Sequence, residues 1–304
     1  MVIDYLLVSV GVLGLIIGSI TDFKKREVAD WLNYFMIISG LGLRLIHSIY
    51  TLDWSFFIYG LLGFGSFLAL AYVMLLTGQW GGGDSKMLMA IGALFATMPG
   101  FVEEMFNPQL FGFPFLLSFW INLLLVGAIY GIIWTLGIGL FHLKDLRKSW
   151  RSWMSDYSVS QMRTISHLAA LVLLVGGFLS YHFTGVHMLL IGGASFTVML
   201  LTFFYLYIFV KSVEESCMYR LVTPEDLVEG DWPFDDIKVD GKIIYSKDKK
   251  VGMETKDIEM LKRFYKQSKI KRIKVKHGVP FVPSFLLSLI VTSLYGNLII
   301  FLIL

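Results

Sequence analysis

Residues 2–30 read VIDYLLVSVGVLGLIIGSITDFKKREVAD, and this stretch decides the fold class. Its apolar run, Val2–Ile20, is long enough to cross a bilayer, which takes about 20 residues. Asp22 follows the run, and the basic residues Lys24–Arg26 follow Asp22. Because the basic cluster comes after the run and no small-residue cleavage site follows, we expect a first membrane span rather than a signal peptide.

The composition extends this expectation to the whole chain. Of 304 residues, 56% are hydrophobic and only 16% are charged, and the mean hydropathy is +0.69. A soluble domain has about 45–50% apolar and about 25% charged residues, so both a soluble protein and a disordered chain are excluded. The single cysteine, Cys217, excludes an internal disulfide, a Cys-based zinc site and an iron–sulfur cluster. We expect neither a metal nor another cofactor.

Further apolar runs predict a polytopic membrane protein. One of them, Ser85–Met98, would extend only about 21 Å as a helix, so we expect it to begin inside the protein. The fold class is therefore all-α, with about eight transmembrane helices of which the fourth is short. The remaining long runs are Trp31–Tyr50, Ser55–Thr77, Phe113–Phe141, Ile165–Phe183, His187–Val210 and Pro283–Leu304.

Residues 212–282 differ from the rest, because they are charged and contain few long apolar runs. Two short apolar segments, Ile237–Val239 and Ile243–Tyr245, flank Asp240-Gly241, which is typical of a β-hairpin turn. Thr255–Gln267 has the apolar spacing of a helix. We predict a small α+β cytoplasmic domain, which serves either as a scaffold for the last span or as a docking site for substrate.

The basic residues indicate the orientation in the membrane. With eight spans, the loops on one side hold every Lys and Arg of the sequence apart from Arg44. The opposite loops hold Asp53, Glu103 and Glu104 and no basic residue. The positive-inside rule then places the basic loops in the cytoplasm and both termini outside. Arg44 lies within the second span, near enough to its far end for the side chain to reach the surface.

Two carboxylates lie at the cytoplasmic ends of predicted spans, where a charge is costly unless it has a partner. Asp22 shares a helical stripe with Gly11 and Gly18, so we expect another helix to approach this face closely. Asp84 follows Gly81-Gly82-Gly83, which separates the third and fourth helices. Both acids fall at one depth, and two carboxylates that meet share a proton, as aspartyl-protease chemistry requires.

Each feature taken alone has a simpler interpretation. Asp84 is typical of a helix N-cap, and Asp22 beside a basic cluster is typical of a solvated interfacial charge. Asp30 is expected to cap the second span, and Glu27 to be an exposed charge with some capacity to contact a basic substrate. An alternative function is an ion-coupled transporter or channel with intramembrane carboxylates, although such sites lie near the midplane between repeated halves.

The same residues resemble a known family. Gly81-Gly82-Gly83-Asp84-Ser85-Lys86 resembles the Gly-x-Gly-Asp motif of the intramembrane aspartyl proteases, which include type IV prepilin peptidases, archaeal preflagellin peptidases and presenilins. Asp22–Val28 and Asp30–Asn33 resemble the first-aspartate segment of the archaeal branch. Gly278–Pro283 also resembles archaeal prepilin-type peptidases, and the similarity is good over residues 1–141.

This resemblance implies a reaction, the cleavage of class III signal peptides from archaellin or type IV pilin-like precursors with basic leaders. It implies cleavage at the cytoplasmic face of the plasma membrane, without a cofactor. The added pair of spans at Ile165–Val210 leaves archaellin and pilin substrates both open. The implied site comprises the catalytic pair Asp22 and Asp84, the site-shaping residues Gly81, Gly83 and Lys86, and the substrate-binding candidates Glu27 and Asp30.

The expected organisation follows from these assignments. The basic amphipathic stretch between the core and the added spans is expected to lie on anionic membrane lipids, and no nucleic-acid partner is expected. The parts are a transmembrane catalytic core at 1–141, a basic cytoplasmic loop at 142–164, an additional helix pair at 165–211, the α+β domain at 212–282 and a C-terminal helix at 283–304.

Overall fold

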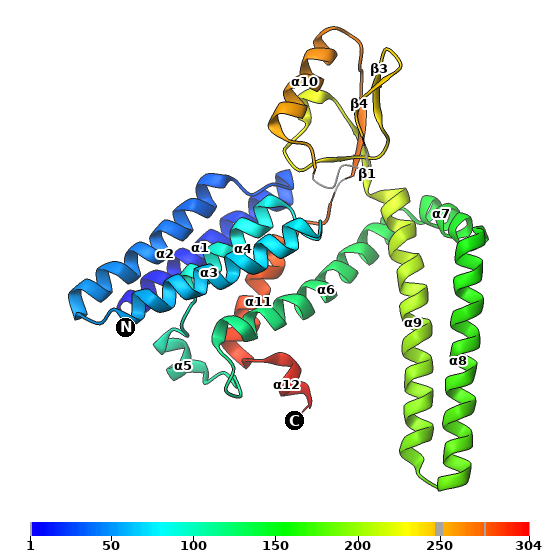
Figure 1. Ribbon diagram of the computed structural model, residues 1–304, viewed down its shortest axis with the longest axis horizontal. Coiled ribbons are helices and arrows are strands. Elements are labelled where there is room, and N and C mark those ends of the chain that lie inside the picture. The colour runs from blue at the N-terminus through cyan, green and yellow to red at the C-terminus, as the bar shows by residue number, and fades with distance from the viewer. Residues whose placement is uncertain (1, 247–251, 277, 304) are drawn as a thin grey trace. The chain divides into compact units, whose positions relative to one another are not determined.

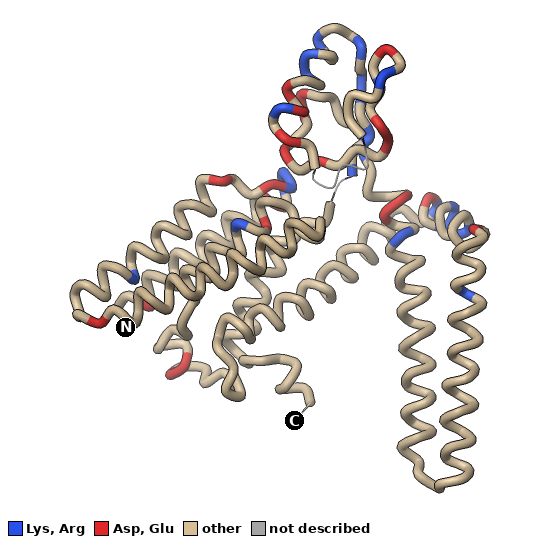
Figure 2. Tube along the Cα trace, in the orientation of Figure 1, with Lys and Arg blue, Asp and Glu red and all other residues tan. Residues whose placement is uncertain are grey.

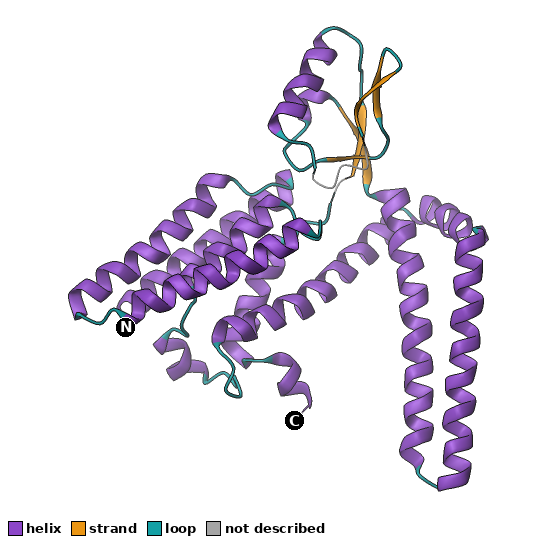
Figure 3. Cartoon of the chain, in the orientation of Figure 1, coloured by secondary structure: helices purple, strands orange, loops and turns teal. Residues whose placement is uncertain are grey.

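The computed structural model describes residues 2–246, 252–276 and 278–303 (Figure 1). The chain forms two compact units, Met1–Gly131 with Arg220–Leu304, and Ile132–Tyr219, and each is described by itself. Helices make up most of the described chain, and the strands among these residues lie between Tyr219 and Lys276 (Figure 3).

Long apolar helices confirm the polytopic membrane architecture. Within the described residues, six helices are long and apolar enough to cross a membrane, whereas the predicted count of eight spans is not confirmed. These helices are α1 (Val2–Lys25), α2 (Asp30–Thr51), α3 (Ser55–Leu76), α6 (Phe115–Phe141), α8 (Tyr157–Thr184) and α9 (His187–Cys217).

The predicted short fourth helix is α4 (Gly82–Leu94), which packs against α1, α2 and α3 (Figure 1). It begins earlier than expected because two of the three motif glycines are helical, and only Gly81 stays extended, as the N-cap. α3 and α4 approach so closely that a Cβ atom on Gly63 would lie 2.5 Å from the carbonyl oxygen of Gly92. Most of α4 is buried, so it forms the centre of this helical bundle.

The last predicted span is not one helix. The chain forms α11 (Val282–Tyr295) and then α12 (Leu298–Ile303). Between them Gly296 has a φ of +80°, which side chains rarely adopt, and its carbonyl accepts a 2.7 Å hydrogen bond from the Asn122 side chain on α6. Apolar composition alone predicted a continuous helix. The helix can break at Gly296 because the Asn122 side chain supplies a hydrogen bond to the backbone there. A short helix, α5 (Gly100–Phe106), follows α4 in the chain.

Arg44 does not reach the surface as predicted from its place in α2. Its side chain is fully buried and donates hydrogen bonds to the carbonyl oxygens of Ala93 and Leu94 at the end of α4. The sequence gives the distance of Arg44 from the end of its own helix, but not the position of the unpaired carbonyls of another helix.

The charged insert contains the predicted α+β fold. The hairpin is confirmed, because β3 (Ile237–Val239) pairs antiparallel with β4 (Lys242–Tyr245) through Asp240 and Gly241, both with positive φ. The predicted helix is α10 (Thr255–Lys266), whose residues Ile258 and Leu261 are buried in the core of this region. The described residues also form a sheet ordered β1 (Tyr219–Val222), β5 (Ile273–Lys276) and β2 (Trp232–Pro233), and a short turn of 3-10 helix, η1 (Pro224–Asp226).

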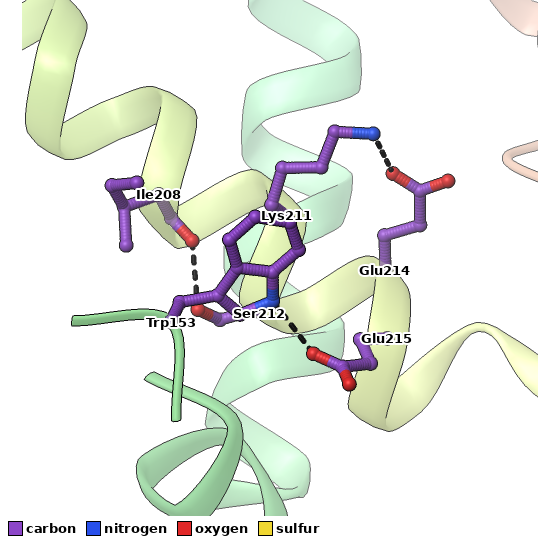
Figure 4. A network of polar contacts seen from close by, with 6 residues as sticks. All are labelled: Trp153, Ile208, Lys211, Ser212, Glu214 and Glu215. Carbon is purple, nitrogen blue, oxygen red and sulfur yellow. Dashed lines mark hydrogen bonds and ion pairs between the residues drawn. The ribbon is translucent and has the colours of Figure 1, made fainter. Parts of the chain in front are cut away.

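In the second unit, α8 and α9 pack against each other, and α7 (Leu143–Ser155) packs at one end of the pair. The charged residues of this unit gather at the α7 end of the two long helices (Figure 2). Glu215 of α9 holds α7 in place, because its carboxylate accepts a 2.6 Å hydrogen bond from Trp153 Nε1 (Figure 4). The same carboxylate accepts a 2.8 Å hydrogen bond from Ser149 Oγ. The apolar face of α7 therefore packs on protein, while its basic residues remain exposed.

Candidate active site

Asp22 lies in the last turns of α1 and is buried, with 6% of its surface exposed. Its Oδ2 atom accepts a 2.9 Å hydrogen bond from the backbone amide of Val282, the first residue of α11. The amides of a first helical turn have no partner within the helix and carry partial positive charge. Asp22 is therefore a carboxylate with a defined partner inside the protein, and not a solvated interfacial charge.

Asp84 is the third residue of α4 and is half-buried. It is not the N-cap that its sequence context alone predicted, because Gly81 holds that position. Instead, the Gly81 backbone amide lies close enough to the Asp84 carboxyl group to act on it electrostatically. The motif glycine is therefore both the N-cap of α4 and a neighbour of the Asp84 carboxyl group.

The two aspartates lie at the same end of the bundle. α1 and α4 touch one turn from each acid, where a Cβ atom on Gly18 would lie 2.9 Å from Met87 Cε. The charge of Asp22 is among those that act on the Asp84 carboxyl group. Residues 62 positions apart in the sequence thus share one electrostatic environment, as two carboxyl groups that divide acid and base roles require.

The other predicted site residues surround this pair in different ways. Gly83 lies beside the loop between α1 and α2, with its Cβ position 3.5 Å from Val28 Cβ. Lys86 Nζ forms a 2.6 Å ion pair with Asp30 Oδ1. Asp30 is the first helical residue of α2 and makes no side-chain cap, so the prediction that it caps this helix is wrong. Glu27 is exposed in the loop.

Sequence reasoning missed the groups that accompany Asp22. Arg26 lies one helical turn after Asp22, and its charge acts on the Asp22 carboxyl group. Tyr130 of α6 belongs to the same cluster, since the charges of Asp22 and Arg26 both act on its hydroxyl group. The spacing of four residues could have indicated Arg26, but no local signal connects Tyr130 or the Val282 amide to residue 22.

No group of three or more His, Cys, Asp or Glu side chains is placed to hold a metal ion in the part of the chain that the structure describes. We therefore assign no metal ligand. The groups at this end of the bundle include two carboxyls and a phenol, which can exchange protons, and a guanidinium, which can stabilise negative charge.

The fold and the site together define a helical membrane protein with two neighbouring aspartates at one end of its bundle. Residues 9–136 match the type IV leader peptidase family, so the resemblance is confirmed over a region that contains both aspartates. A preflagellin peptidase of Methanococcus maripaludis is 44% identical over 85 residues, and one of Methanocaldococcus jannaschii is 40% identical over 85 residues. Each of these two matches covers 28% of this chain.

A longer match joins this chain to a prepilin peptidase, EppA of Methanothermobacter thermautotrophicus, with 24% identity over 197 residues and 63% of this chain. The chain spans 36% of the length of the two preflagellin peptidases and 51% of the prepilin peptidase. No solved structure gave a significant match.

Proposed function

We propose that this protein is a membrane-embedded aspartyl endopeptidase that removes class III signal peptides from archaellin or type IV pilin-like precursors. The observation that carries the proposal is the placement of Asp22 and Asp84 at one end of the bundle, where the charge of one acts on the other. The match of residues 9–136 to the type IV leader peptidases supports it.

In the proposed reaction the two carboxyl groups take complementary roles. The ionised carboxylate accepts a proton from a water molecule, whose oxygen attacks the carbonyl carbon of the scissile peptide bond. The protonated carboxyl polarises that carbonyl and then donates its proton to the leaving amine as the C–N bond breaks. The Val282 amide holds one of the two acids in place throughout.

The proposed site faces the cytoplasm, and both termini lie outside. The basic residues beside it, Lys24–Arg26 and Lys86, support this orientation through the positive-inside rule. A precursor with a basic leader then presents its cleavage site at this membrane face, where Glu27 and Asp30 provide negative charge. Membrane lipids surround the apolar helices, and the basic face of α7 meets anionic headgroups.

The test is cleavage of purified archaellin and pilin precursors by the purified protein in lipid, followed by mass spectrometry of the products. We expect one junction to be cut, after a short basic segment and before the hydrophobic stretch. Asp22→Asn and Asp84→Asn should each reduce the rate by about 10²–10⁴-fold, the range that acid–base groups supply. Asp53→Asn, in the loop between α2 and α3, is the matched control and should cleave normally.

Two outcomes contradict the proposal. Normal cleavage by either Asn variant removes that aspartate from the mechanism. Failure of the wild-type protein to cut any precursor, together with Asp84-dependent cation flux in vesicles, favours the ion-coupled transporter. Cleavage of only one precursor type identifies the substrate.

A further inference from the structure

Arg44 is a charged side chain buried completely inside the bundle, at 0% exposure. Its Nε donates to the carbonyl oxygen of Ala93 at 3.0 Å, and its Nη2 donates to that of Leu94 at 3.0 Å. These acceptors are the last two residues of α4. Further donations go to the Phe56 carbonyl at 3.2 Å and to Thr97 Oγ1 at 3.2 Å.

The end of α4 needs such a partner because the helix is short. Its 13 residues extend about 20 Å, whereas the hydrocarbon core is about 30 Å thick. A helix that begins near the cytoplasmic face therefore ends at a depth where water does not reach its last carbonyl groups. A guanidinium group satisfies two of them and places positive charge at the negative end of the helix dipole.

The surroundings of Arg44 leave little freedom for the side chain. Its guanidinium carbon lies 4.4 Å from the centroid of the Phe56 ring, and a Cβ atom on Gly60 would lie 2.5 Å from Arg44 Cδ. Three helices, α2, α3 and α4, thus meet on one side chain. A lysine has a single nitrogen and cannot reproduce this planar set of donors.

We propose that Arg44 is a positioning residue, which fixes the depth and rotation of α4 and thereby holds Asp84 opposite Asp22. A displacement at one end of α4 is transmitted to the other end, because Asp84 and Leu94 belong to one continuous helix. A shift at the C-terminal end therefore moves the aspartate by a similar distance. This inference rests on the proposed function of the two aspartates.

The first experiment measures position without activity. Asp22→Cys and Asp84→Cys are combined in a Cys217→Ser chain, and their reaction with bismaleimides of increasing length is compared with and without Arg44→Met. We expect Arg44→Met to slow cross-linking by the shortest effective reagent several-fold. Unchanged cross-linking overturns the proposal, and this result stands whether or not the protein is a peptidase.

The second experiment separates positioning from stability in the otherwise wild-type protein. Arg44→Met should lower kcat for precursor cleavage by about 100-fold with little change in KM, because a displacement near 1 Å has an effect of this size. The kcat of Arg44→Lys should lie between those of the wild type and Arg44→Met. If Arg44→Met does not fold, Arg44→Lys provides the test. A wild-type kcat in a folded Arg44 variant overturns the proposal.

The matched control is Ser48→Ala, one turn after Arg44 in α2. Ser48 is buried and accepts a 3.1 Å hydrogen bond from the Phe57 amide of α3. Its loss should lower stability without changing kcat. If Ser48→Ala and Arg44→Met lower kcat equally, any loss of contacts between α2 and its neighbours lowers kcat. That result overturns a specific role for Arg44.

Discussion

The backbone amide of Val282 lies 2.9 Å from Oδ2 of Asp22, a residue 260 positions earlier in the chain. This hydrogen bond joins the end of α1 to the start of α11. Hydrogen bonds to charged groups contribute about 1.5–3 kcal/mol to the stability of a protein, which is more than neutral ones contribute. The last part of the sequence therefore completes the surroundings of an acid in the first helix.

Packing beside this bond should be sensitive to one added side chain. A Cβ atom on Gly18 would lie 2.9 Å from Met87 Cε and 3.3 Å from Val282 Cγ1, so Gly18→Val requires these side chains or α1 itself to shift. We expect a loss of cleavage rate of about 10–100-fold, measured on purified precursor. Ile17→Val, at the adjacent position with an exposed side chain, should leave the rate unchanged. Equal rates in both variants would show that this contact is not needed.

The close packing of α4 against α3 predicts that alanine substitutions at two glycines of α3 differ in their effect on stability. Gly63→Ala places a methyl group against the Gly92 carbonyl, whereas no atom lies within 4 Å of a Cβ atom on Gly65. Overpacking should reduce the free energy of unfolding by about 1–3 kcal/mol for Gly63→Ala. Gly65→Ala should be neutral or stabilising by about 0.5–1 kcal/mol, because alanine favours the helix. Unfolding in mild detergent compares the two, and similar values would argue against the close approach.

The two acidic residues of the α1–α2 junction should differ in their effect on substrate. Asp30 is already paired with Lys86, while Glu27 is exposed in the loop. Glu27→Gln should raise KM for a basic leader several-fold with kcat nearly unchanged, and Asp30→Asn should have a smaller effect. The partners of the ion pair are 31% and 56% exposed, so a double-mutant cycle should give a coupling below about 1 kcal/mol. A kcat loss for Glu27→Gln as large as that for Asp22→Asn would contradict these roles.

The α+β region between Tyr219 and Lys276 should show a pH-dependent stability that centres on Asp231. Burial raises the pKa of this carboxyl group, and the effect outweighs the 3.0 Å hydrogen bond from the Val228 amide that opposes it. The folded state therefore binds the proton more tightly than the unfolded state, and stability falls as pH rises from the unfolded pKa through the folded one. Asp231→Asn keeps an oxygen acceptor and removes the titration.

Hydrogen exchange of the intact protein tests this expectation. The Val228 amide donates to the Asp231 carboxyl group, and the Met253 amide donates to the Asp231 backbone carbonyl. Exchange of both amides is compared in wild type and Asp231→Asn at each pH, so that the intrinsic pH effect cancels. We expect the wild type to lose protection relative to the variant as pH rises above about 4, near the unfolded pKa of Asp. A constant ratio between the two proteins would rule out a contribution from Asp231.

Local pattern was sufficient for most of the elements, and it indicated the two candidate aspartates. The apolar run Val2–Ile20 predicted α1, and the turn at Asp240-Gly241 predicted the hairpin, because a helix and a two-residue turn depend on residues close in sequence. The Gly-x-Gly-Asp motif indicated Asp84, and the end of the first span indicated Asp22. Local pattern erred at the last span, where apolar residues continue through Gly296 although the backbone turns there.

The amino-acid sequence by itself thus determined a polytopic helical protein with an α+β insert, and it predicted two acids near the ends of helices. Only the tertiary structure decided that Arg44 binds the end of α4, that Lys86 pairs with Asp30 and that Val282 binds Asp22. The reason is physical: hydropathy and turn preference act between neighbours along the chain. Partners of buried charges and of unpaired helix ends are instead chosen by proximity in space, which depends on how all the helices pack.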